Sequence, residues 1–158
     1  KVNKYEIYEK VIALHRDIES REKENYFWSM MKRTNIAMRF VQGTAIAIWT
    51  KGSYIPGDFA DRIYMVEVKS KDRNALEQIL KKKKIAYTEK EITQERPLIY
   101  IIKRKSIKRE LRDHIPIMPL KELVSWCERL GLDSVLEHLN EMYHLRLKVQ
   151  YAEVRTNR

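Results

Sequence analysis

The spacing of apolar residues predicts that the first forty residues are helical. Over residues 4–24, apolar side chains recur three and four positions apart, which is the spacing of one face of an amphipathic helix; they are Tyr8, Val11, Ile12, His15 and Ile18. Residues 25–40 are apolar enough to form a second helix or a kinked continuation of the first.

The period then shortens to two, which is typical of strands. Residues 61–70 alternate, so Glu67 and Lys69 share one face while Val66 and Val68 share the other. The apolar run 44–50 also predicts a strand. The turn-forming residues Gly52, Pro56 and Gly57 separate the two runs. We therefore expect the two strands to form a hairpin.

Further along, Ser70 or Asp72 is expected to cap a helix that runs to about Lys83. Two more strands are predicted at 85–91 and 97–105, and a short basic helix at 106–115. Prolines and Gly131 then delimit a helix at 120–130, and Asp133 caps another at 134–145. The tail, 146–158, is either more helix or a final extension.

The composition fits one α+β domain. The chain has 158 residues, of which 44% are hydrophobic and 34% charged, so it is long enough for a sizeable core. We expect N-terminal helices in 1–40, a ββαββα core in 41–115 and a C-terminal helical extension in 116–158. No apolar run approaches the roughly 18 residues of a membrane span, and no signal peptide is recognisable, so we expect no membrane partner and a cytoplasmic location.

The net charge of +10 favours a polyanionic partner, most simply nucleic acid. Two clusters are suited to phosphate contacts and would make binding sensitive to salt. The alternative is that both are ordinary solvated surface. The clusters are Lys81, Lys82, Lys83 and Lys84, and then Lys103, Arg104, Lys105, Lys108, Arg109 and Arg112.

Three segments, in this order, resemble the LAGLIDADG homing endonuclease family. They are "VEVKSKDRNALEQILKKKKIAY" (66–87), "PLIYIIKRKSIKRELRDHIP" (97–116) and "HLRLKVQYAEV" (144–154). The likeness covers roughly residues 36–115 and the tail. It implies an α-β-β-α-β-β-α core with an antiparallel sheet, whose hairpins read base edges in the major groove.

This chain departs from the family at the motif that gives the family its name. The family places metal-binding aspartates at a helix end, where this chain has Gln42 and Thr44 or, in another alignment, Lys32, Arg33 and Thr34. The resemblance therefore implies a DNA-binding scaffold that does not cleave phosphodiester bonds. Such a protein would bind duplex DNA, or less readily structured RNA, as a homodimer or within a larger assembly. Its hairpin would offer Lys51, Arg62 and Lys69, although acidic residues lie among them.

A metal-dependent nuclease is the alternative. Restriction-enzyme-like nucleases place an acidic residue before a Glu-x-Lys strand, and Asp58 or Asp61 with Glu67 and Lys69 match that order. The carboxylates would hold Mg²⁺ and the lysine would orient the attacking water.

Apart from that Mg²⁺, we expect no metal or cofactor. Cys127 is the single cysteine, and the four histidines lack ligand spacing. A third hypothesis is a protein-interaction module, in which helices of 1–40 and 116–158 dock onto a larger complex.

Overall fold

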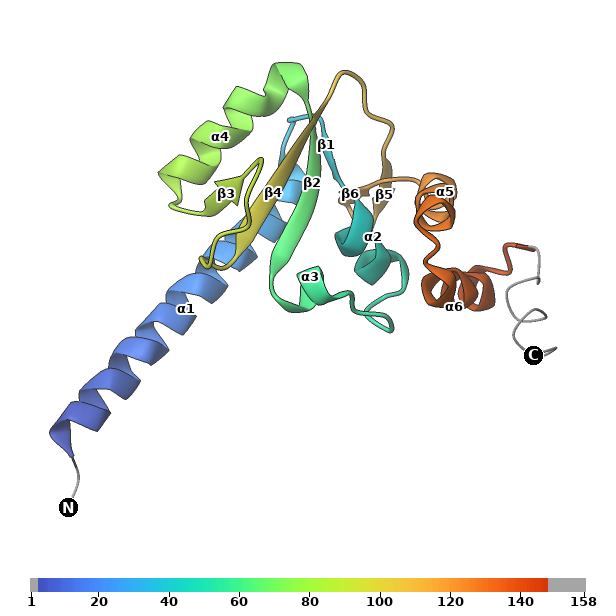
Figure 1. Ribbon diagram of the computed structural model, residues 1–158. Coiled ribbons are helices and arrows are strands. Elements are labelled where there is room, and N and C mark those ends of the chain that lie inside the picture. The colour runs from blue at the N-terminus through green and yellow to red at the C-terminus, as the bar shows by residue number, and fades with distance from the viewer. Residues whose placement is uncertain (1–2, 148–158) are drawn as a thin grey trace.

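The computed structural model describes residues 3–147 and has an α+β fold with a mixed, six-stranded sheet (Figure 1). The strand order is β3-β4-β2-β1-β6-β5. The elements in chain order are α1 (Lys4–Arg33), β1 (Met38–Phe40), α2 (Gln42–Trp49), α3 (Gly57–Ala60), β2 (Ile63–Lys69), the 3₁₀ turn η1 (Ser70–Asp72), α4 (Arg73–Lys82), β3 (Ala86–Thr88), β4 (Leu98–Arg104), β5 (Glu110–Arg112), β6 (Ile115–Ile117), α5 (Leu120–Leu130) and α6 (Asp133–Tyr143).

The centre of the sheet is the parallel pair of β2 and β4, in register from Ile63 opposite Leu98 to Lys69 opposite Arg104. Strand β1 runs antiparallel to β2, and β6 runs parallel to β1. Residues 63–68 of β2 are all buried, because helices cover both faces of the sheet at its centre. Parallel strands of this kind are usually covered on both faces.

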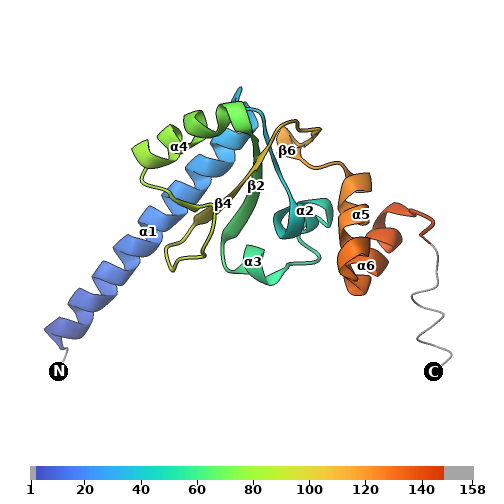
Figure 2. The same cartoon turned by 45° about the horizontal axis from the view of Figure 1, so that its top comes forward.

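Helices α1 and α4 lie on one side of the sheet (Figure 2). The rings of Phe27 and Trp28 on α1 pack against those of Phe40 on β1 and Tyr64 on β2. Aromatic pairs of this geometry add to the stabilisation that burial supplies. The N-terminal half of α1 continues past the edge of the sheet (Figure 1).

Helices α2, α5 and α6 lie on the other side (Figure 2). The Thr44 hydroxyl accepts a hydrogen bond from the backbone N–H of Met65, which joins α2 to β2. The Trp49 indole N–H donates to the carbonyl of Met118, which joins α2 to the segment before α5. This side of the sheet carries Arg39 and Glu67 and forms the candidate site.

Residues 44–50 are helical, so the prediction of a strand there, and of a hairpin with 61–70, is wrong. Helix α2 is buried nearly all round, so its sequence has no polar face that could show a helical period. A short apolar run of this kind cannot be assigned to helix or strand from periodicity alone. The first forty residues also differ from expectation, because α1 ends at Arg33 and β1 begins at Met38.

The predicted basic helix at 106–115 is wrong as well, because this stretch forms most of the β5–β6 hairpin. Asp113 and His114 connect the strands and both have positive φ, 50° and 67°. A two-residue loop with φ positive at both positions matches the right-handed twist of the flanking strands. The hairpin holds Leu111 opposite Pro116.

The sheet is mixed, so the antiparallel sheet that the family resemblance implied is wrong. The helices predicted in 120–145 are confirmed as α5 and α6, and the strands at 61–70 and 97–105 as β2 and β4. The segment 148–158, which carries most of the third family-like motif, lies outside the described residues. Within residues 3–147, no helix is both long and apolar enough to cross a membrane.

Candidate functional site

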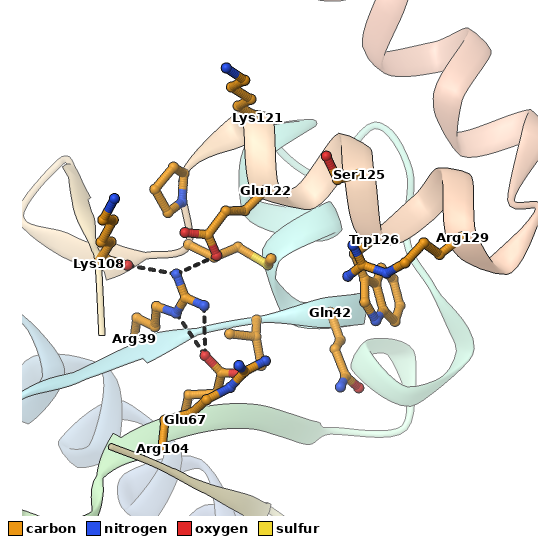
Figure 3. A pocket seen from close by; sticks show the side chains of 13 residues that line it. Arg39, Gln42, Glu67, Arg104, Lys108, Lys121, Glu122, Ser125, Trp126 and Arg129 are labelled. Atoms are coloured by element: carbon orange, nitrogen blue, oxygen red, sulfur yellow. Dashed lines mark hydrogen bonds and ion pairs between the residues drawn. The ribbon is translucent and has the colours of Figure 1, made fainter. Parts of the chain in front are cut away.

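A cavity of about 600 Å³ lies between β1, β2 and β4 on one side and α5 on the other (Figure 3). Its lining combines an excess of cations with two carboxylates, one amide and one indole. The charged and polar lining residues are Arg39, Gln42, Glu67, Arg104, Lys108, Lys121, Glu122, Ser125 and Arg129, and Trp126 supplies the aromatic ring.

The floor of the cavity is an ion pair between cross-strand neighbours, Arg39 on β1 and Glu67 on β2. Nε and Nη2 of Arg39 lie 2.8 and 2.7 Å from Oε1 of Glu67, and both side chains are only 6% exposed. A guanidinium that donates two hydrogen bonds to one carboxylate is held in a fixed orientation. The pair therefore fixes the register of β1 against β2.

The same pair connects three further segments (Figure 3). Nη1 of Arg39 donates to the carbonyl of Lys108 at 2.6 Å and lies 2.8 Å from Oε2 of Glu122 on α5. Nε of Arg104 on β4 lies 3.0 Å from Oε2 of Glu67. Two guanidinium groups thus face two carboxylates, and this network is neutral overall.

Three cations add a net positive charge to the neutral network. The side chains of Lys108, Lys121 and Arg129 have no hydrogen-bond or ion-pair partner among residues 3–147, and all three residues are exposed. Trp126 and Arg129 are three residues apart on α5, so they share one side of that helix. The wall of the cavity therefore offers an aromatic ring next to a guanidinium.

Two helices begin at the cavity, α2 at Gln42 and α5 at Leu120, and neither has a side-chain N-cap. The first N–H groups of a helix have no partner within the helix and give that end a partial positive charge. Gln42 also has φ of +51°, a left-handed conformation that is costly for a residue with a side chain.

A group of exposed or half-buried cations lies at the C-terminal ends of β2 and β4, which are side by side in Figure 1. Lys69 is the register partner of Arg104, and the Ser70 hydroxyl donates to the carbonyl of Arg104. We name this group the basic rim; it consists of Lys69, Lys71, Arg104, Lys105, Lys108 and Arg109. The nearby carboxylate of Asp72 accepts a hydrogen bond from the backbone N–H of Ala37. Arg104 and Lys108 belong both to the rim and to the cavity.

The other predicted basic residues lie elsewhere. Lys81–Lys84 precede β3, which begins beside Leu98 at the start of β4, whereas Arg104 ends that strand. A seven-residue strand is about 20 Å long, so the two predicted clusters are at opposite ends of the sheet. Lys83 lies over the ring of Tyr26, and Lys103 is exposed near the end of β4.

Three further predicted residues are separate from the rim. The guanidinium of Arg112 lies over the ring of Trp49 at 4.4 Å. Arg62 forms an ion pair with Glu24 on α1. Lys51 lies in the loop after α2 rather than on a hairpin. The predicted base-reading set of Lys51, Arg62 and Lys69 is therefore not brought together.

The residues of the nuclease hypothesis are also apart. Asp58 is on α3, and Asp61 pairs with Arg96 at 2.8 Å before β2 begins. Glu67 is six residues further, or about 20 Å along an extended chain, and its oxygens face Arg39 and Arg104. The described residues contain no group of three His, Cys, Asp or Glu side chains that could hold a metal ion.

Sequence reasoning missed several residues of the site, above all Arg39, Gln42, Glu122, Trp126 and Arg129. One signal was available, because Arg39 is the single charged residue in the apolar run "AMRFV" and Glu67 is the single charged residue in "YMVEV". Single opposite charges in two buried strands indicate a buried pair. No family model, curated protein or solved structure matches this chain, so its function is inferred from the cavity and the rim.

Proposed function

We propose that this protein binds nucleic acid without cleaving it, and that the basic rim and the cavity contact the phosphates. Duplex DNA is the preferred form and structured RNA the second. The observation that carries the proposal is the convergence of cations without an ion-pair partner from the β4–β5 loop and α5 around one cavity, next to the basic rim at the ends of β2 and β4.

The rim suits phosphates better than a carboxylate-bearing metabolite. It is a group of exposed or half-buried cations at the ends of two neighbouring strands and in the loop after β4, and several long side chains close together can contact successive charges of a phosphate backbone. Lys105 and Lys108 have no ion-pair partner among the described residues. At these two residues, binding would thus release counterions without first breaking an internal ion pair.

The cavity adds a second kind of contact. The partially positive starts of α2 and α5 favour an anionic oxygen, as helix N-termini do in phosphate sites. Trp126 and Arg129 offer a surface on which an unstacked base, such as a loop or bulge of structured RNA presents, can stack. The buried pair of Arg39 and Glu67 keeps these walls in place without contributing net charge.

This proposal does not require a homing-endonuclease scaffold. The family resemblance implied an antiparallel sheet with a reading hairpin in 44–70, whereas β2 and β4 are parallel and residues 42–49 are helical. The charge of the rim supports binding whatever the ancestry of the fold.

A binding titration with fluorescent duplex DNA at several salt concentrations tests the proposal. The double variant Lys105→Ala/Lys108→Ala removes two rim charges, so the negative slope of log K against log salt should become shallower by about 2. The matched control is Lys82→Ala/Lys84→Ala, which removes the same charge at the other end of the sheet. We expect the control to keep most of the affinity.

Equal losses in both double variants would show that only net charge matters, and would overturn the rim as the binding site. Absence of salt-dependent binding by the unaltered protein would refute the function itself. A competition with structured RNA decides the preferred form. Plasmid DNA incubated with the protein and Mg²⁺ should stay intact. Nicking that EDTA abolishes would refute the proposal that the protein does not cleave nucleic acid.

A further inference from the structure

The N-terminal half of α1 carries an apolar seam that nothing in the described chain covers. Four aliphatic residues, Ile7, Val11, Leu14 and Ile18, are 47%, 46%, 59% and 45% exposed. Contiguous exposed apolar residues of this kind usually mark an interaction surface. We name these four residues the α1 seam.

The α1 seam points away from the body of the protein. Phe27 and Met31, the two buried residues of α1, mark the side that packs on the sheet. At 100° per residue, the seam lies roughly 150° around the helix from them. The helix also projects past the sheet in both views (Figures 1 and 2). A partner can therefore approach the seam without touching the sheet.

The spacing of the seam is that of a coiled coil. Its residues are four, three and four positions apart, which is the alternation of the apolar positions of a heptad. We propose that α1 pairs with α1 of a second copy of this chain in antiparallel orientation. In that register Val11 packs against Leu14 of the second copy, and Ile7 packs against Ile18 of the second copy. Such a contact is self-complementary about a two-fold axis.

The flanking charges select a second copy and this orientation. Lys10 and Asp17 are seven residues apart, so they lie on the same flank of the seam. An antiparallel two-fold pair brings the same flank of both helices together. Each Lys10 then faces Asp17 of the other copy, and two opposite-charge contacts form. Asp17 also pairs with Arg21 within its own helix, but this pair is exposed and weak.

A parallel pair has no such complementarity. It would bring the flank of Asp17 against the opposite flank of the second helix, on which Glu22 lies one turn further along. Like charges at these flanking positions disfavour the arrangement. The antiparallel pair also places the two sheets at opposite ends of the joined helices, so both basic rims stay accessible. The inference is independent of the proposed function.

Analytical ultracentrifugation of the full chain over a range of concentrations tests the pairing. We expect a reversible monomer–dimer equilibrium, and Leu14→Glu should weaken it by at least about tenfold because each dimer loses two buried leucines. Leu130→Glu is the matched control, since Leu130 is a helical leucine that is 57% exposed outside the seam. Its dimerisation should equal that of the unaltered chain.

Charge reversal tests the orientation. Lys10→Asp alone should weaken the dimer, and Lys10→Asp/Asp17→Lys should restore it. A parallel pair predicts instead that Asp17→Lys alone strengthens association, which would overturn the antiparallel arrangement. A chain that stays monomeric at all concentrations, or a Leu14→Glu variant that dimerises like the control, would overturn self-pairing. Circular dichroism of each variant verifies that α1 remains folded.

Discussion

Arg39 and Glu67 face each other across β1 and β2 as a buried pair of opposite charges whose loss neither strand could accommodate. Both side chains are only 6% exposed, so water can solvate neither charge fully once its partner is removed. A buried charge that loses its partner is far more costly than the intact pair is stabilising. The pair is therefore a condition of the fold as much as a part of the site.

Glu67→Ala should destabilise the protein by about 3–5 kcal/mol, because Arg39 would remain buried without its closest carboxylate. Urea unfolding followed by tryptophan fluorescence measures this loss. Glu122→Ala removes the other carboxylate on Arg39, but Glu122 is 40% exposed and water can replace it. That control should cost no more than about 1 kcal/mol. A loss below about 1 kcal/mol for Glu67→Ala would mean that Glu122 alone is enough to compensate the charge of Arg39.

The expected destabilisation also decides which variant can test the nuclease hypothesis. An inactive Glu67→Ala protein would be uninformative if the change unfolds it. Lys69, the other member of the Glu-x-Lys pattern, is only half-buried, and within residues 3–147 its side chain has no ion-pair partner. Lys69→Ala is therefore the variant that can separate loss of cleavage from loss of fold.

The sequence predicted those elements whose two faces differ in polarity. Helices α4 and α5 have clear apolar stripes, and their positions agree with the predicted ones. Helix α2 has no polar face, and the β5–β6 hairpin turns at Asp113 and His114 rather than at glycine. Both were assigned wrongly, because burial on all sides and an unusual turn pair remove the local signals on which prediction depends.

The candidate site was predictable only in part, for a different reason. Arg104 and Lys108 stand in a conspicuous basic run, whereas Arg39 and Trp126 come from distant parts of the chain. The parallel pairing of β2 with β4 and the packing of α5 bring them together. Such long-range pairing leaves no local pattern. The Glu-x-Lys pattern predicts a metal-binding role for Glu67, whereas its oxygens face two guanidinium groups.

Gln42→Gly should make the protein more stable and weaken its binding. A non-glycine residue at φ +51° costs about 1–2 kcal/mol, and the greater flexibility of glycine in the unfolded chain offsets about 0.5–1 kcal/mol of the gain. The net stabilisation should thus be up to about 1.5 kcal/mol by urea unfolding. Affinity for duplex DNA should fall, because the amide that lines the cavity is lost.

His144→Gly is the control for that change. His144 is the C-cap residue that follows α6, has φ of +51° and is not part of the cavity lining. It should give a similar stabilisation and leave affinity unchanged. Unchanged affinity in Gln42→Gly would show that the strained backbone at Gln42 serves folding and not binding.

Stability should decrease in acid partly through Glu77. The hydrogen bond from the Tyr87 hydroxyl, and next that from Arg73, holds the pKa of Glu77 below its ordinary value of 4.5. A lowered pKa stabilises the folded state above pH 4.5, and this contribution is lost as the pH falls through the folded value. Tyr87→Phe should therefore raise the pKa of Glu77 and destabilise the protein at neutral pH, but less at pH 3.

The pKa of Glu77 can be followed by NMR titration of its carboxyl carbon, and the stabilities by urea unfolding at both pH values. Tyr100→Phe is the control, because the Tyr100 hydroxyl donates to the carbonyl of Lys90 and not to a carboxylate. Its effect on stability should be the same at both pH values. The same pKa for Glu77 in Tyr87→Phe and in the unaltered protein would refute the assignment.

Cys127 should react with a thiol probe only when the protein opens. It is the single cysteine, its side chain is fully buried on α5, and burial, followed by the nearby Glu128, raises the pKa of its thiol to about 11. The thiolate is the reactive form, so both access and ionisation are suppressed at neutral pH. We expect labelling in the native state to be slow and to accelerate steeply with urea.

An exposed thiol two residues away, in Cys127→Ala/Ser125→Cys, should instead react at once and independently of urea. Equal native-state rates for the two thiols would show that α5 does not stay packed on the core, and the wall that α5 gives the cavity would then be lost as well.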